Sequence, residues 1–153
     1  MNPLTNSDTE LFIQRTFDAP RELVFRMWTE AEHLSRWCCP IGFTIPHSEG
    51  DIRAGGRFRT CMRSPTGEDH WLGGTYREIV PPERLVFTHA WQEADGSSNH
   101  QTVVTVTFEA RQGKTQLSLH QAFFQDAASR AGHEGGWQET FDNLTQYLAR
   151  QAA

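Results

Sequence analysis

Long apolar runs and clusters of Lys or Arg are both missing from this sequence. No segment approaches the roughly 18 consecutive apolar residues that span a membrane. The 14 basic side chains are outnumbered by 19 acidic ones, which gives a net charge of −5 at pH 7 and argues against a nucleic-acid partner. The segment 1–8 lacks the basic and apolar stretches of a secretion signal. We therefore expect a soluble, cytoplasmic protein whose partner is neither a membrane nor a nucleic acid.

Cysteine is scarce, and catalytic motifs are missing. Three cysteines, with Cys38 next to Cys39, cannot form the disulfide framework of a small secreted protein, which fits a reducing compartment. There is no Cys-x-x-Cys pair and no Gly-x-Ser-x-Gly elbow, and the seven histidines do not pair at metal-ligand spacing. Residues 113–115 and 133–137 begin like a phosphate-binding loop and a zinc-protease helix, but each lacks an obligatory residue. We expect no catalytic motif, no metal and no cofactor.

Aromatic residues, in contrast, are abundant. The chain of 153 residues contains five Trp and ten Phe. A chain of this length forms about one domain and can bury an ordinary core without disulfides or metals. Because so many rings exceed what such a core normally needs, they either fill the core or line a cleft.

Alternating apolar and polar residues predict a series of strands. They are expected over about residues 10–17, 44–52, 57–62, 70–80, 84–91, 101–110 and 115–122. The strand over 44–52 contains a proline and is expected near an edge. Loops of turn-forming residues, such as 94–99, join the last six strands, so the sheet should be antiparallel.

Helical signals lie at both ends of the strand series. Short helices are expected over 20–29, with Asp18 accepting a hydrogen bond from the first turn, and over 31–37. A long amphipathic helix is expected from near residue 126 or 129 to near 150, with its apolar stripe on the sheet. The predicted fold class is α+β, one domain over residues 10–151 after a tail of residues 1–9.

Gly135 and Gly136 interrupt the last helical pattern. Each costs about 1 kcal/mol relative to Ala inside a helix. Three explanations stay open: the helix starts after them, the backbone packs closely there, or they give a ligand access.

Few polar residues are candidates for chemistry. His89 and His120 are expected on strands separated by one other strand, about 10 Å apart. Each is an ordinary hydrogen-bonded histidine, a cavity-lining polar or general acid–base group, or a metal ligand, and the first interpretation is preferred. Glu78 and Glu134 are ordinary charges or buried carboxylates that act on a ligand, and the cysteines are best interpreted as small apolar filler.

Several segments together resemble one known family. Residues 17–25 (Phe-Asp-Ala-Pro-Arg-Glu-Leu-Val-Phe), 28–29 and 34–37 closely resemble the Hsp90-ATPase-activator-homologue (AHSA1-like) family. The same is true of residues 55–58, 76–79, 81–87 and 135–137. The segments follow the family's order over about residues 10–150, and jointly they are specific. This family is part of the START-like (SRPBCC, Bet v 1-type) superfamily.

The resemblance implies a helix-grip fold: a curved antiparallel sheet of about seven strands around a long C-terminal helix, with two short helices after the first strand. Such proteins enclose a cavity between helix and sheet that often binds apolar or aromatic molecules. The family shares no catalytic motif, so the resemblance supplies no catalytic residue. Relatives commonly carry a second tryptophan where this chain has Cys38, a change that would reshape one wall.

The first functional hypothesis is a module that binds an apolar or aromatic small molecule in this cavity. Its lining is expected within a pool of large rings and two histidines, about half of which should be plain core. The pool is Trp28, Trp37, Phe43, Phe58, Trp71, Phe87, His89, Trp91, His120, Trp137 and Phe141.

Two other functions are weighed against binding. One is a cyclase- or hydrolase-type enzyme that acts on a polyketide-like or aromatic ligand, with His89, His120 or Glu78 as the acting group. The other is a regulator of an Hsp90-type chaperone. Eukaryotic activators carry an additional N-terminal domain for which this chain has no room, which argues against a chaperone partner. Exposed sheet edges leave a homodimer open, and no feature favours one.

Overall fold

The computed structural model describes residues 6–93, 97–98 and 100–152. Within them, seven strands form one sheet in the order β1-β7-β6-β5-β4-β3-β2, and every neighbouring pair is antiparallel. The strands are β1 (Glu10–Phe17), β2 (Thr44–Gly50), β3 (Arg57–Arg63), β4 (Asp69–Val80), β5 (Arg84–Trp91), β6 (Thr102–Arg111) and β7 (Lys114–Ala122). The sequence predicted all seven and their antiparallel pairing.

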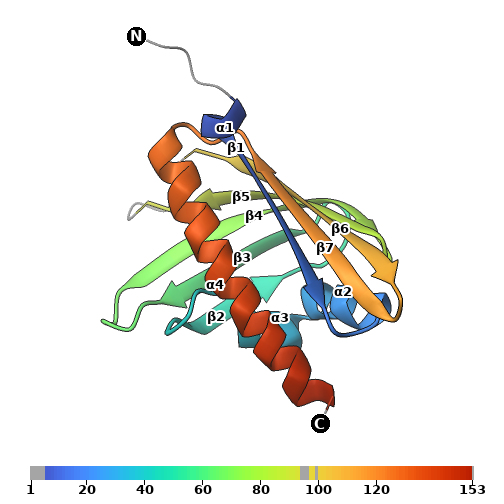
Figure 1. Cartoon of the computed structure of the whole chain (residues 1–153). Coiled ribbons are helices and arrows are strands. Elements are labelled where there is room, and N and C mark those ends of the chain that lie inside the picture. Colours follow the sequence, from blue (N-terminus) through green and yellow to red (C-terminus); the bar gives the residue numbers. More distant parts are fainter. Residues whose placement is uncertain (1–5, 94–96, 99, 153) are drawn as a thin grey trace.

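In the same described residues, four helices accompany the sheet: α1 (Asn6–Thr9), α2 (Arg21–Thr29), α3 (Ala31–Trp37) and α4 (Ala127–Ala152). The long helix α4 crosses one face of the sheet, and α2 and α3 lie beside its C-terminal half (Figure 1). This is the helix-grip arrangement that the resemblance implied. No helix in the described ranges is long and apolar enough to cross a membrane.

Three local predictions differ from the structure. One helical turn, α1, occupies part of the segment expected to be a tail. Asp18 does not cap α2: Pro20 is the N-cap residue, and its carbonyl accepts hydrogen bonds from the amides of Leu23 and Val24. Most of the expected loop over 94–99 lies outside the described residues.

One half of the sheet is filled by packed side chains. On β6 and β7 the inward positions alternate with outward ones, and the large inward side chains are at most 2% exposed: Val104, Val106, Phe108, Leu117 and Leu119. They belong to the same core as Phe141, Leu144 and Leu148 of α4. The period of two and the helical spacing of 3 and 4 therefore converge on one apolar layer.

β4 and β5 approach each other closely at Gly74. A Cβ atom built there would lie 1.9 Å from the carbonyl oxygen of Thr88 and 2.9 Å from the ring of Phe58. Two residues further along β4, the register with β5 shifts between Tyr76 and Glu78. Glycine and a shift of register are the usual means of bending a strand, and here they bend the sheet around α4.

β2 lies at the end of the strand order opposite β1 and forms an edge of the sheet. It pairs only with β3, most of its residues are exposed, and it contains Pro46. Proline has no backbone N–H to donate and is tolerated at an edge. The predicted edge position of this strand is confirmed.

Truncation of Phe141 should show how much of the stability resides in the filled half. Its ring is fully buried and meets Phe17 edge to face at 5.8 Å. We expect Phe141→Ala to lower the free energy of unfolding by about 3–5 kcal/mol in urea titrations. Gln146→Ala, at an exposed position of the same helix, should change it by less than about 0.5 kcal/mol. If the two variants lost the same free energy of unfolding, Phe141 would not belong to a tightly packed core.

Candidate ligand-binding cavity

A cavity of about 480 Å³ lies between α4 and the other half of the sheet. In the described chain its lining residues come from α2, α3, β2 to β5, α4 and the segments that join them, and none comes from β1, β6 or β7. The sheet therefore has a filled half (β1, β7, β6) and a hollow half (β5 to β2). Both halves face the same helix.

A row of small residues on α4 explains why the second half is hollow. Ala128, Gly132, Gly136 and Thr140 are spaced by four, so they share one face of the helix, and all four line the cavity. A Cβ atom built at Gly132 would meet nothing within 4 Å, and one at Gly136 only the ring of Pro40 at 4.0 Å. The helix thus presents backbone where a large side chain would fill the space.

These contacts decide between the three explanations for the glycines. α4 begins at Ala127, so the helix does not start after Gly135 and Gly136, and that explanation is wrong. Close packing is wrong as well, because an added Cβ atom would meet nothing within 4 Å at Gly135 and only the ring of Pro40, at 4.0 Å, at Gly136. For Gly136 the remaining explanation, room beside the cavity, agrees with its place in the lining. Gly135 is exposed and does not line it.

The structure brings most of the predicted aromatic pool together. The pool members that line the cavity are Trp28, Phe43, Phe58, Phe87, His89, Trp91 and Trp137. Trp28 and Trp137 stack with ring centroids 6.0 Å apart. The indole N–H of Trp28 is buried without a hydrogen-bond partner in the described part of the chain, so ring packing alone holds it. Contact of these residues with a ligand stays a prediction.

Two pool members are plain core behind the cavity. Trp37 is fully buried, donates its indole N–H to the carbonyl of Met27 at 3.1 Å, and packs edge-on against Trp28 at 4.9 Å. Phe141 is fully buried in the filled half. Neither ring lines the cavity.

Two further members lie on the outer face of the sheet. Trp71 is next to the inward Leu72 on β4 and lies under the guanidinium of Arg59 at 3.8 Å. His120 points away from the core and pairs with Glu10 at 3.1 Å. Side chains alternate along a strand, so the prediction that Leu119 points inward already implied that His120 points outward. This alternation was not applied when His120 was predicted to line the cavity.

His133 was not in the pool, although it lines the cavity. Its Nδ1 donates to the carbonyl of Ser129 at 2.7 Å, and its Nε2 accepts the indole N–H of Trp91 at 3.0 Å. Both ring nitrogens are therefore occupied, and with Nε2 accepting, the hydrogen that the ring donates lies on Nδ1. The available signal was helical spacing, since His133 precedes the lining residue Trp137 by four positions.

His89 is the deeply buried histidine of the cavity. It is 8% exposed, and its ring lies 5.4 Å from that of Trp91 and 5.7 Å from that of His133. Burial, and secondarily the neighbouring His133, lowers the pKa of His89 to about 3. The imidazole is therefore neutral at physiological pH.

The other groups proposed for chemistry are differently placed. Glu78 lies outside the lining and faces Arg84 at 3.4 Å, and Glu134 is paired with Arg130 at 3.0 Å. Cys38 lines the cavity, but burial raises the pKa of its thiol to about 12 and leaves it protonated. Of the acid–base candidates His89, His120 and Glu78, His89 alone lines the cavity.

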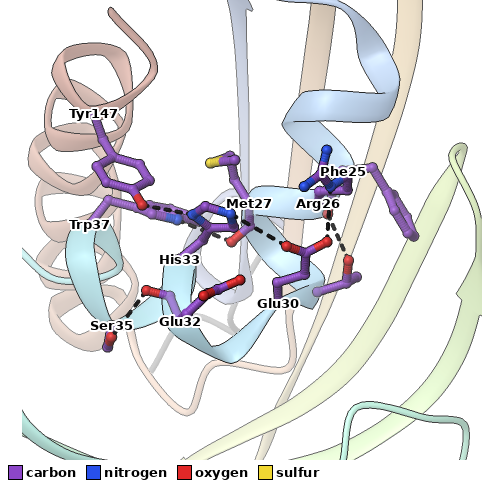
Figure 2. A network of polar contacts seen from close by, with 10 residues as sticks. Phe25, Arg26, Met27, Glu30, Glu32, His33, Ser35, Trp37 and Tyr147 are labelled. Atoms are coloured by element: carbon purple, nitrogen blue, oxygen red, sulfur yellow. Dashed lines mark hydrogen bonds and ion pairs between the residues drawn. The ribbon is translucent and has the colours of Figure 1, made fainter. Parts of the chain in front are cut away.

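A polar cluster outside the cavity connects α3 to α4 (Figure 2). Glu30, Glu32 and His33 place potential metal-ligand atoms within 4.8 Å of one another. Two of the three residues are already engaged: Glu30 pairs with Arg26 at 2.9 Å and with His33 at 3.3 Å, and His33 hydrogen-bonds the hydroxyl of Tyr147 at 2.7 Å. The contacts are those of a connection between helices.

The curved antiparallel sheet, the long helix and the cavity between them define a protein of the START-like, helix-grip class. Residues 18–149 match the family described as Activator of Hsp90 ATPase homolog 1-like protein. This match covers most of the chain, and the protein belongs to that family, as the resemblance indicated.

Solved structures of similar fold come from several bacteria. An AHSA1 protein from Silicibacter pomeroyi has 24% identity and a TM-score of 0.85, with 93% of this chain and 99% of that one covered. A protein from Chromobacterium violaceum has 26% identity and a TM-score of 0.80, with coverages of 91% and 96%. An uncharacterized protein from Rhizobium leguminosarum has 27% identity and a TM-score of 0.76, with coverages of 94% and 95%. Among curated proteins, none matches this chain.

Acid should destabilise the protein through His89. Below pH 6.5 a histidine in the unfolded chain takes up a proton, whereas the buried His89 does not until about pH 3. The free energy of unfolding therefore falls with pH in this window, by up to about 1.4 kcal/mol per pH unit from this group. Urea titrations between about pH 6.5 and 5 should show a shallower pH dependence for His89→Leu. Equal slopes would contradict the lowered pKa.

Proposed function

We propose that the protein binds an apolar or aromatic small molecule in the cavity between α4 and the hollow half of the sheet, with residues 10–151 acting as one binding domain. The row of small residues on α4 is the observation that carries the proposal. Two helix-interior glycines cost about 1 kcal/mol each, and their local effect is to keep the space open. A volume of about 480 Å³ lies within the range of small-molecule sites.

The chemistry of the walls favours flat, apolar molecules. Indole and phenyl rings from α2, β3, β5 and α4 surround the cavity, among them Trp28, Phe58, Phe87 and Trp137. Such rings pack against other rings by stacking or edge-to-face contact. A ligand with aromatic faces would therefore gain more than its buried area alone provides.

Binding is preferred here over catalysis. Acid–base catalysis in the cavity would use a positioned group and commonly a second group to orient it or to return the proton. Of the candidates His89, His120 and Glu78, only His89 is in the described lining. The nitrogens of the nearby His133 are occupied by Trp91 and Ser129. Regulation of a chaperone has no comparable support from the described surface.

Ligand binding should raise the melting temperature. A ligand at 100 times its Kd adds about 2.7 kcal/mol to the free energy of unfolding. For a chain of this size the melting temperature should rise on the order of 5–10 °C. We expect such a shift from at least one member of a panel of flat aromatic, polyketide-like and fatty-acid molecules, together with a saturable change in tryptophan fluorescence. A flat response across the panel would contradict the proposal.

Filling the cavity should separate stability from binding. Gly132→Leu and Gly135→Leu both improve helix propensity by up to about 1 kcal/mol. The first places its side chain at the cavity and the second does not. For any ligand found in the panel, we expect Gly132→Leu to weaken binding at least about tenfold and Gly135→Leu to leave it unchanged. Retained affinity in the folded Gly132→Leu protein would place the ligand elsewhere.

A further inference from the structure

The cavity offers an acidic ligand no lysine or arginine as a countercharge; the basic side chains in its described lining are His70, His89 and His133. Among its lining residues in the described chain there is no Lys or Arg, and Glu49 is the single carboxylate. The side chain of Glu49 is 61% exposed and lies 3.4 Å from His47, so its charge is at the solvent edge. A carboxylate or phosphate that entered the cavity would lose its hydration without gaining an ion pair, and burial of an unpaired charge is costly.

The ionisable groups that are buried in the lining are neutral. Burial raises the pKa values of Cys38 and Tyr76 and lowers that of His89. The walls are therefore apolar rings interrupted by a few uncharged polar groups. An uncharged ligand matches such walls, and an anion does not.

His89 has hydrogen-bonding capacity that the fold leaves unused. Its side chain is nine-tenths buried and lines the cavity. The imidazole hydrogen-bonds the backbone of its own residue, and no other residue of the described chain hydrogen-bonds it. Its neighbours differ, because Trp91 and His133 hydrogen-bond each other and His133 also bonds Ser129. One ring nitrogen of His89 is therefore left for a ligand, and a ligand that hydrogen-bonds it inside the cavity gains affinity.

The chemistry of a neutral imidazole further limits the kind of ligand group that can pair with His89. One ring nitrogen donates and the other accepts, and a hydroxyl group can do both. A hydroxyl can therefore pair with whichever nitrogen faces the cavity. The rings of Phe87 and Trp91, which flank His89 along β5, also line the cavity and suit an aromatic body.

Taking the cavity as the ligand site proposed above, we propose that it selects an uncharged aromatic molecule that carries a hydroxyl group. His89 is the side chain that hydrogen-bonds this hydroxyl. The ring system of the ligand lies against the aromatic walls, and its polar group faces β5.

Three probes that differ only in their polar group test the selection. Binding of naphthalene, 2-naphthol and 2-naphthoate to the wild-type protein is measured by isothermal titration calorimetry at neutral pH. We expect 2-naphthol to bind about tenfold more tightly than naphthalene, the effect of one net hydrogen bond. The 2-naphthoate anion should bind at least about tenfold more weakly than 2-naphthol.

Variants then test the role of His89. His89→Leu should reduce the affinity for 2-naphthol about tenfold, to that of naphthalene, and change naphthalene binding less than about twofold. His89→Gln retains an amide that can donate and accept, so it should recover part of the preference. His120→Leu replaces a histidine on the outer face and should alter neither affinity. Thermal melts verify that each variant is folded, and the wild-type ranking needs no variant.

The outcomes separate the two proposals. If none of the three probes binds, the hydroxyl selection fails, and the cavity function fails with it only if the broader panel of aromatic, polyketide-like and fatty-acid molecules also gives no response. If naphthalene binds as tightly as 2-naphthol, if 2-naphthoate binds tightest, or if His89→Leu weakens all probes equally, the selection by His89 is overturned while the binding cavity stands.

Discussion

The packing of α4 against the curved sheet is the interaction on which the rest of the structure depends. The C-terminal half of the helix carries Phe141, Leu144 and Leu148 into a close-packed core with β1, β6 and β7. The N-terminal half faces β2 to β5 with Ala128, Gly132 and Gly136 and leaves a cavity. The stacked Trp28 and Trp137 belong both to the core and to the cavity lining. One helix thus completes a packed core with its C-terminal half and forms one wall of the cavity with its N-terminal half.

In this arrangement the small residues of α4 lower the stability of the helix and its packing, and they leave the space of the cavity open. Glycines in a helix interior reduce stability, and an empty apolar space forgoes contacts that a large side chain would make. Proteins commonly depart from local rules at the sites that they use. The departures here are concentrated on one face of α4, which lines the cavity together with His89 and Trp91 of β5.

Much of the fold could be predicted from the sequence, because strands with one buried face alternate and the last helix carries a regular stripe. The site could be predicted only in part. A count of rings does not distinguish a ring that fills a core from one that lines a cavity, so Trp37 and Phe141 entered the same pool as Trp28. Strand alternation could have removed His120. No residue type in the sequence marks an empty space. The hydrogen bond that sets the tautomer of His133 comes from Trp91, which is 42 positions away in the sequence.

The separation of a filled half from a hollow half also bears on how the family can diverge. Substitutions far apart in a structure act on stability nearly independently. Residues of β2 to β4 that face the cavity can therefore change while the core under β1, β6 and β7 keeps the chain folded. Such a scaffold is evolvable, because its descendants can change the ligand that they bind while they keep the same core and fold.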